Sequence, residues 1–387
     1  MTLAKKIFIV SASLLALVLI LWGVYFLAFQ PKNVSSNPDI VETDVDVEVE
    51  KPLDLIPEKN ENNKIYSIST DPVTAPTIDE RGTGINYYSR DNGRCYNIDF
   101  DGTNKKAIIN EDQDGLIDAF WSPDKKRVIS KFLIKDKIKF FYYDFTTRKN
   151  MELKDNIDSL NWQNNNRILY KYYDAVSQKR ILTAADPDGS NWKDIAEISY
   201  RNVSIQAIPQ SSFISFWNEP DALTSTTLQS IPIFGGEVKT IFKDKFGTDY
   251  LWSPDGSKLL ISHLNEKQGK TFQLAVANEQ GGEYQPLQIP TFISKCVWSA
   301  DGKYVYFALP LSIPENVLLP NDYNTRKFTT ADTFWKVEVA TGKKSRLIET
   351  EDIAGKYDAT GLFLNKTESV LFFINRLDNK LYRLDLK

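Results

Sequence analysis

The stretch "LWSPDGSKLL", residues 251–260, decides the fold because the chain repeats it. It returns as "FWSPDKKRVI" (120–129) and as "VWSADGKYVY" (297–306). Weaker copies occupy 161–170, 208–217 and 362–373, and a first unit at 76–88 keeps the pattern without the Trp. Successive units lie about 41 to 47 residues apart, except for a last step of 65. Such a period predicts a fold built from one repeated supersecondary unit.

Each unit reads as four short strands, and the quoted stretch supplies the turn between the first two. Pro254 presets φ at the second turn position, Asp255 suits the third, and Gly256 tolerates positive φ at the fourth. Trp252 ends the first strand as a large apolar surface for a neighbouring sheet. Four-stranded units of about 45 residues cannot bury both faces alone, so the sequence predicts an all-β propeller with radial sheets.

The units predict a seven-bladed propeller, although six or eight blades also fit because the fourth unit is degenerate. The last unit, 358–387, supplies three strands, whereas 63–70 forms a single strand pattern before the first unit. Pairing that strand into the last blade would close the ring and remove an exposed edge. We therefore expect one N-terminal strand to join three C-terminal strands.

"WSPDG" followed by a β-rich stretch, a third strand such as "LYRLDLK" and this period resemble the TolB-type WD-like β-propeller repeat. The same repeat builds the non-catalytic propeller of prolyl oligopeptidase-type enzymes. The resemblance covers about residues 63–387 and implies the fold. Because the family contains binding modules, scaffolds and enzyme accessories, it leaves the function open. TolB itself resembles a six-bladed soluble propeller with an additional N-terminal domain, which this chain replaces with other segments.

The N-terminal segment predicts a membrane anchor. Residues 7–29 hold 23 positions with no charge and only two serines. A helix of this length spans roughly 34 Å, which is enough for a bilayer core. Lys5 and Lys6 precede it, so the N-terminus (1–6) should stay in the cytoplasm while the rest is exported. A cleaved signal peptide is the alternative, but the apolar run is long and lacks a small-x-small cleavage site.

The next segment, 30–62, predicts a flexible acidic stalk. Acidic residues outnumber basic ones, prolines recur, and Gly and aromatic residues are missing. Val alternates with Asp or Glu over 41–50, which leaves an edge strand as the alternative. A run of like charges is typical of a solvated linker. We expect it to hold the propeller domain, 63–387, away from the cell membrane, in the periplasm or at the cell surface.

Composition excludes several function classes. The net charge of −4 offers no basic stripe for a nucleic acid. The two cysteines, Cys95 and Cys296, form neither a disulfide framework nor a zinc spacing. His263 is the single histidine, and no G-x-S-x-G elbow occurs, so a prolyl oligopeptidase-like catalytic site is excluded within this chain. We therefore predict no catalytic residue.

Residues 110–118, "NEDQDGLID", suggest a calcium loop of the integrin type. Alternate carboxylates in this spacing can converge on one Ca²⁺ ion, while the Gly allows a tight turn. The alternative is that Asp118, three residues before Trp121, belongs to the repeat, because Asp249 stands three residues before Trp252 in the same way. The candidate Ca²⁺ ligands are Asn110, Asp112, Asp114, the Leu116 carbonyl and Asp118.

An insertion at 310–332 interrupts the connection between the second and third strands of the sixth unit. Loops of this length are usually functional, and its mixture of apolar, aromatic and charged residues is typical of interaction surfaces. A loop that caps its own blade is the alternative. Propeller geometry predicts that it shares a face with 218–224 and 264–270, and that the calcium-like loop reaches that face. The candidate binding residues are Leu318, Leu319, Tyr323, Arg326 and Phe328, together with Glu219 and Asp221.

These patterns favour a membrane-anchored extracytoplasmic propeller that acts as a binding or scaffold module for a protein, a peptide or an envelope glycan. The alternative is an extracytoplasmic hydrolase or lyase in which carboxylates such as Glu219 and Asp221 meet others across the central channel. Asp and Glu occupy 51 positions, so some pair looks plausible by number alone. We therefore prefer the binding module.

Overall fold

The computed structural model describes residues 64–386. The predicted cytoplasmic N-terminus (1–6), anchor (7–29) and stalk (30–62) lie outside the described residues. Over 64–386, no helix combines the length and the apolar character that a membrane span requires.

Short antiparallel strands make up nearly all of the regular structure, as the repeat predicts. The first three sheets are β2 (Val73–Ile78), β3 (Gly84–Ser89), β4 (Cys95–Asp99), β5 (Lys106–Ile109); β6 (Leu116–Trp121), β7 (Arg127–Ile134), β8 (Lys137–Asp144), β9 (Asn150–Glu152); and β10 (Ile157–Asn164), β11 (Arg167–Asp174), β12 (Lys179–Ala185), β13 (Lys193–Glu197). A seven-stranded sheet follows with β14 (Val203–Ala207), β15 (Phe213–Asn218), β16 (Ser225–Pro232), β17 (Lys239–Trp252), β18 (Lys258–Leu264), β19 (Phe272–Asn278) and β20 (Gln285–Pro286).

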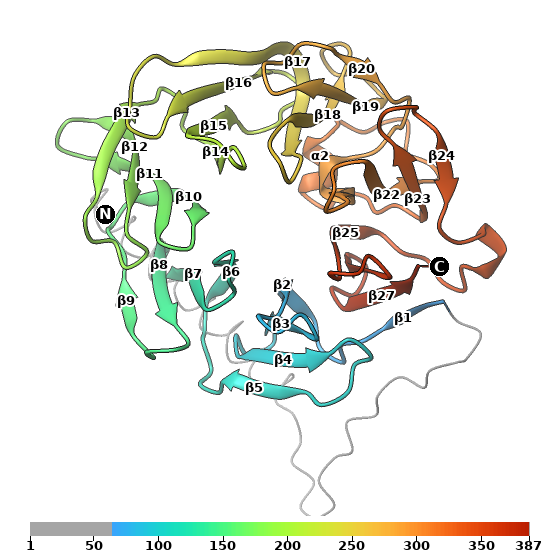
Figure 1. Ribbon diagram of the computed structural model, residues 1–387, viewed down its shortest axis with the longest axis horizontal. Helices are drawn as coiled ribbons and strands as arrows, with labels where there is room; N and C mark the ends of the chain where they lie inside the picture. Colours follow the sequence, from blue (N-terminus) through green and yellow to red (C-terminus); the bar gives the residue numbers. More distant parts are fainter. Residues whose placement is uncertain (1–63, 387) are drawn as a thin grey trace, which may run out of the picture. The chain divides into compact units, whose positions relative to one another are not determined.

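The remaining sheets complete the ring. They are β21 (Cys296–Trp298), β22 (Tyr304–Pro310), β23 (Asp332–Glu338), β24 (Lys344–Arg346); and β25 (Ala359–Leu364), β26 (Val370–Asn375), β27 (Leu381–Asp385) with β1 (Ile65–Ser67). The short helices are η1 (Ile293–Lys295), α2 (Asn321–Asn324) and η2 (Thr350–Asp352). Successive sheets follow one another around a ring, with the first strand of each near the middle and the last near the rim (Figure 1). The predicted all-β propeller is therefore confirmed.

The ring closes by pairing the two ends of the described chain. β1 runs antiparallel to β27, with Tyr66 opposite Arg383 and Ser67 opposite Tyr382. Because β25, β26 and β27 come from the C-terminus, the sheet joins one N-terminal strand to three C-terminal ones, as expected. β27 thereby loses the free edge that a lone third strand would expose.

β17 takes part in two ladders. Its first half, from Lys239 to Phe246, pairs with β16, and its second half, ending at Trp252, pairs with β18. The seven-stranded sheet also packs against itself, because Trp217 of β15 and Leu259 of β18 belong to one buried cluster.

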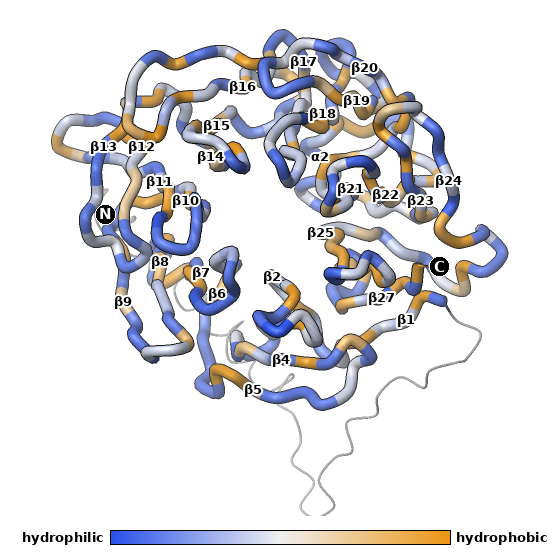
Figure 2. Tube along the Cα trace, in the orientation of Figure 1, coloured by the Kyte–Doolittle hydropathy of each residue, from blue (hydrophilic) through white to orange (hydrophobic). Residues whose placement is uncertain are grey.

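The core lies between neighbouring sheets, and apolar stretches recur along the strands while the turns are mostly hydrophilic (Figure 2). The repeated Trp residues join each of their units to the unit before it through an indole N–H. Trp121 donates to the Ala75 carbonyl at 2.8 Å, and Trp298 donates to the Leu251 carbonyl at 3.1 Å, so both bonds reach the preceding sheet. Trp252 of β17 donates to Ser215 Oγ of β15 at 2.9 Å, within the seven-stranded sheet. The repeated Trp therefore bonds to the preceding unit as well as packing against it.

The repeated turn has the geometry that its residues predict. Ser253 Oγ donates to Asp255 Oδ1 at 2.6 Å and accepts the Lys258 backbone N–H at 2.9 Å. The Gly256 N–H donates to the Ser253 carbonyl at 2.9 Å, with Gly256 at φ +72°. The hydroxyl and the carboxylate thus satisfy the turn itself and serve no chemistry.

Candidate functional site

The insertion folds back over one end of the ring. Asn321 of α2 donates through Nδ2 to Asp221 Oδ2 at 2.8 Å and accepts the Ala222 N–H at 3.0 Å. Lys270 Nζ donates to the Val317 carbonyl at 3.2 Å. The insertion therefore shares a face with the turns 218–224 and 264–270, as expected.

The same segment also reaches the last sheet. Arg326 Nη2 donates to Asn379 Oδ1 at 2.8 Å, and Arg376 Nη2 donates to the Tyr323 carbonyl at 2.7 Å. The Arg376 guanidinium carbon lies 3.8 Å from the Tyr323 ring centroid. One loop thus spans from the β15–β16 turn to the β26–β27 turn.

A buried ion cluster anchors the insertion. Lys295 Nζ lies 2.6 Å from Asp332 Oδ2 and 2.8 Å from Asp358 Oδ1, and none of the three side chains is exposed. Tyr323 Oη donates to Asp358 Oδ1 at 2.7 Å. Burial alone would raise the pKa of Asp358, but the Lys295 ammonium and these hydrogen bonds hold that pKa below its usual range. The cluster is therefore a charge-assisted anchor for the loop.

The expectation of exposed binding residues is wrong for Leu319 and Tyr323, whose side chains are 0% and 2% exposed. Both belong to a cluster with Phe292, whose ring stacks on Tyr323 at a centroid distance of 4.1 Å. Leu318 and Phe328 are half-buried, and Arg326 is exposed. The apolar residues of the insertion leave water by packing under their own loop, as the capping alternative describes.

A polar pocket lies where the insertion meets its neighbours. It has a volume of about 600 Å³, a size typical of small-molecule sites. Both Glu219 and Asp221 line it, so the structure brings these two predicted residues together with α2. The other lining residues are Tyr200, Arg201, Asn202, Asn218, Pro220, Thr224, Ser225, Thr227, Asn321, Asn324 and Thr325.

The two carboxylates of this polar pocket have different tasks. Burial alone would raise the pKa of Asp221, but the Asn321 amide and the N–H groups of Leu223 and Thr224 donate to it and lower that pKa. Asp221 therefore holds the pocket together. Glu219 is exposed and forms no ion pair with any residue of 64–386, so its carboxylate is free to meet a ligand.

Lys171 lies below the same pocket. Its side chain is fully buried, its Nζ is 2.6 Å from Asp158 Oδ2, and it donates to the Arg201 carbonyl. Burial lowers the pKa of Lys171, although Asp158 opposes this shift. This contact fixes the connection that carries Tyr200 and Asn202.

Two carboxylates of the predicted calcium loop have other partners in the structure. Arg94 Nε lies 2.6 Å from Asp112 Oδ1, so that carboxylate already has a cationic partner. Asp118 accepts the Ala119 N–H at 2.8 Å, and burial raises its pKa. Over 64–386 there is no group of three or more His, Cys, Asp and Glu residues able to hold a metal ion. The calcium site of Asn110, Asp112, Asp114, the Leu116 carbonyl and Asp118 also uses amide and backbone oxygens, and it stays a prediction.

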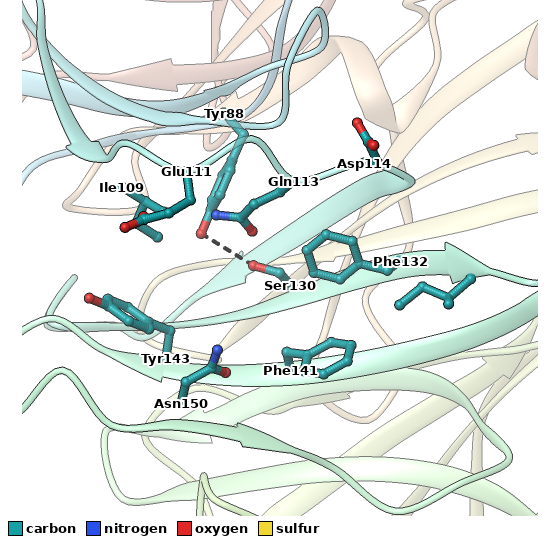
Figure 3. Close-up of a pocket in the computed structure, with 11 residues that line it drawn as sticks. Tyr88, Ile109, Glu111, Gln113, Asp114, Ser130, Phe132, Phe141, Tyr143 and Asn150 are labelled. Atoms are coloured by element: carbon teal, nitrogen blue, oxygen red, sulfur yellow. Dashed lines mark hydrogen bonds between the residues drawn. The ribbon is translucent and has the colours of Figure 1, made fainter.

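The calcium-like loop instead lines a groove between the first two sheets (Figure 3). As expected, it reaches the face of the second-to-third-strand turns, since the Gln113 N–H donates to the Asn92 carbonyl at 2.8 Å. The groove has a volume of about 460 Å³. Its residues are Tyr88, Ile109, Glu111, Gln113, Asp114, Ser130, Phe132, Ile134, Phe141, Tyr143 and Asn150.

Sequence reasoning singled out Asp114 as a candidate calcium ligand, but it predicted neither this groove nor its aromatic wall. Phe132 and Phe141 lie on β7 and β8 and meet edge to face at a centroid distance of 5.4 Å. The run "KIKFFYYD" (137–144) was a signal, because successive aromatic residues in a strand must project to both faces. Its spacing does not say which of them would border an open groove.

Two buried titratable groups, Asp249 and His263, have partners within the fold. Burial raises the pKa of Asp249, and its carboxylate accepts Trp217 Nε1 at 3.0 Å and the Tyr250 N–H at 3.0 Å. His263 Nε2 lies 2.5 Å from the Tyr284 hydroxyl oxygen, and burial lowers the pKa of the imidazole. Both groups therefore contribute hydrogen bonds to the packing of the strands.

Comparison with known proteins gives the fold more firmly than the function. No protein family model matches the chain. A curated relative, "Uncharacterized peptidase YuxL" of Bacillus subtilis (strain 168), is 32% identical over 122 residues. These cover 31% of this chain and 17% of the relative, so the matched part is a small fraction of that protein.

Solved structures match over most of the chain. An oligogalacturonate lyase in complex with manganese has a TM-score of 0.60 at 12% identity. The match covers 84% of this chain and 93% of the lyase chain. The β-propeller domain of the Trilobed protease from Pyrococcus furiosus has a TM-score of 0.55 at 14% identity. That match covers 81% of this chain and 95% of the domain. TolB from Acinetobacter baumannii is also similar, with a TM-score of 0.45 at 14% identity, over 70% and 61%. At these identities the likeness shows a β-propeller fold alone.

Proposed function

We propose that this chain is a membrane-anchored extracytoplasmic binding module whose propeller takes a hydroxyl-rich glycan in the polar pocket beside α2. The observation that carries the proposal is that Glu219 and Asn324 of the folded-back insertion line one pocket. The predicted anchor at 7–29 supports the membrane location, and its export direction follows from Lys5 and Lys6.

The composition of the polar pocket favours a glycan over an apolar peptide. Its lining combines side-chain amides and hydroxyls, which both donate and accept hydrogen bonds as sugar hydroxyls do. The side chains of Asn202 and Asn324 are exposed and make no hydrogen bond with residues of 64–386. Tyr200 adds one aromatic ring, whereas the apolar residues of the insertion are packed beneath it.

The seven-bladed count is part of the same proposal. Dividing β17 near Phe246 turns the seven-stranded sheet into two sheets of about four strands, each like the others. The buried cluster of Trp217 and Leu259 then lies between two blades, as clusters do between the other sheets. In this count the long insertion belongs to the sixth blade and closes one end of the ring.

The proposal is tested with an array of oligosaccharides, including amino-sugar and uronate polymers, probed with the purified full-length chain. We expect Glu219→Gln and Asn324→Ala to weaken retention of any bound glycan about tenfold, because each removes a free polar group of the pocket. The matched controls are Glu315→Gln and Asn316→Ala, which change exposed residues of the same insertion outside the pocket. Retention that is equal in all four variants, or no retention by the wild-type chain, would refute the glycan proposal.

The second candidate function is a lyase or hydrolase, and one observation favours it. Burial raises the pKa of the Asp118 carboxyl, which is the direction in which the pKa of a general acid is tuned. The same array therefore includes oligogalacturonate with and without Mn²⁺, and products are followed by mass spectrometry. Shortened or unsaturated products that disappear in Asp118→Asn would replace the binding proposal with the enzyme.

A further inference from the structure

The groove between the first two sheets is a second site with chemistry of its own. It lies between β3 and β5 on one side and β7 and β8 on the other (Figure 3). Tyr88 and Ser130 close its inner end, with 3.2 Å between their hydroxyl oxygens. The outer part remains open to solvent and is separate from the polar pocket, with which it shares no lining residue.

The wall of the groove is apolar and aromatic. Phe132, Phe141 and Tyr143 line it together with Ile109 and Ile134. In Figure 3, Tyr88 points toward Ser130 from the first sheet, and Phe132 lies beside Ser130 on β7. An apolar side chain that enters the groove would leave water and contact these rings.

The rim carries negative charge and free amides. Glu111 and Asp114 are exposed, and neither forms an ion pair with a residue of 64–386. Gln113 and Asn150 also line the groove, and their side-chain amides make no hydrogen bond in the same part of the chain. The carboxylates would attract a cation, and the amides match the hydrogen-bonding groups of a peptide backbone.

One exposed large hydrophobic residue of the described chain lines the groove. It is Ile134, which is 39% exposed and lies on β7 with Phe132. Because residues two apart on a strand project to the same face, Ile134 extends the apolar wall from Phe132 toward the open side of the groove.

We propose that this groove binds an extended segment of a partner protein in which a Leu or Phe side chain is flanked by Lys or Arg. The apolar side chain enters the groove and packs against the wall that Phe132 and Phe141 form together, and the basic side chain meets Glu111 and Asp114 at the rim. The charge of the rim excludes an acidic segment by repulsion. The site goes beyond the glycan proposal because it uses different residues and a different class of ligand.

The experiment measures fluorescence anisotropy of three labelled peptides with the full-length chain in detergent. The first contains Lys-Phe-Leu-Lys between glycines, the second Glu-Phe-Leu-Glu, and the third Lys-Ser-Ser-Lys. We expect the first to bind at least tenfold more tightly than the other two, with an affinity that falls as salt rises. Equal affinity for all three peptides, or no binding of the first at millimolar concentration, would overturn the proposal.

Variants then assign the binding to the groove. Glu111→Lys and Ile134→Asp change exposed positions, and we expect each to weaken the first peptide at least tenfold. The controls are Glu237→Lys and Val176→Asp, which make the same changes at exposed positions elsewhere and should alter the affinity less than twofold. Weakening by the controls as large as by the groove variants would place the peptide elsewhere and refute this site. Asn324→Ala should leave peptide binding unchanged, so this result is independent of the glycan proposal.

Discussion

At the scale of single residues, one repeat position takes different tasks in different units. Asp118, Asp249 and Lys295 each stand three residues before the repeated Trp. Asp249 accepts the indole N–H of Trp217, whereas Lys295 gathers the carboxylates of Asp332 and Asp358. The same repeat position therefore carries either an acid or a base, with different partners in different units.

Lys295 therefore offers a sharp test of the buried anchor. Lys295→Met leaves two carboxylates buried without their cation, so we expect the free energy of unfolding to fall by about 3–5 kcal/mol. Urea unfolding followed by tryptophan fluorescence measures the loss. Lys303→Met is the control, because the pair of Lys303 with Asp301 is exposed and its removal should barely move the midpoint. A Lys295→Met midpoint equal to that of the control would contradict the anchor.

Tyr323 shows where residue-level prediction fails. Its place in a long loop beside Arg326 and Phe328 suggested exposure, but its ring stacks on Phe292 and its hydroxyl donates to Asp358. Both partners come from other parts of the chain, 31 and 35 residues away. No local spacing reports such a contact.

At the scale of elements, the repeated turn joins two repeat units as well as two strands. A Cβ atom at Gly256 would collide with the Pro209 carbonyl of the preceding unit. The glycine is thus required both by its positive φ, +72°, and by this close approach. The turn sequence predicted the first requirement, and only the packing of the sheets shows the second.

A comparison of Gly256 with Gly342 separates the cost of the positive φ from the cost of the close approach. Gly256→Ala and Gly342→Ala both place an alanine at positive φ, which costs about 1–2 kcal/mol. At Gly342 nothing lies within 4 Å of the added Cβ. We therefore expect Gly256→Ala to lower the free energy of unfolding by about 1–3 kcal/mol more than Gly342→Ala, because the chain must also shift. Thermal unfolding of both variants measures the difference. Equal losses of unfolding free energy would show that the chain near Pro209 shifts without a measurable cost.

At the scale of the whole molecule, closure depends on a strand distant in sequence from its partners. β1 pairs with β27 through Ile65 opposite Leu384, and both side chains are fully buried. Ile65 packs in the cluster that contains Phe334 and Phe373 of the last two sheets. The first described strand is therefore part of the core that ends the ring.

Because β1 closes the ring, a substitution in this strand should lower the stability of the whole propeller. Ile65→Ala should lower the free energy of unfolding by about 2–5 kcal/mol while the chain still unfolds in one transition, since neighbouring sheets support one another. Lys64→Ala, which removes an exposed ion pair with Asp352, serves as the control and should have little effect. Calorimetry of the full-length chain distinguishes the outcomes. A separate early transition would mean that the last sheet opens independently of the ring.

The sequence by itself determined the all-β repeat, the Ser–Asp–Gly turn, the closing strand and the place of the insertion. These features depend on local φ preferences, strand alternation and period, which neighbouring residues carry. Tertiary structure alone decided that Leu319 and Tyr323 are buried, that Asp112 meets Arg94, and that Phe132 borders a groove. These outcomes depend on how separate sheets pack and on which distant side chains meet. Burial and the geometry of the partners set the free energy of such contacts, and the spacing of residues in the sequence contains neither.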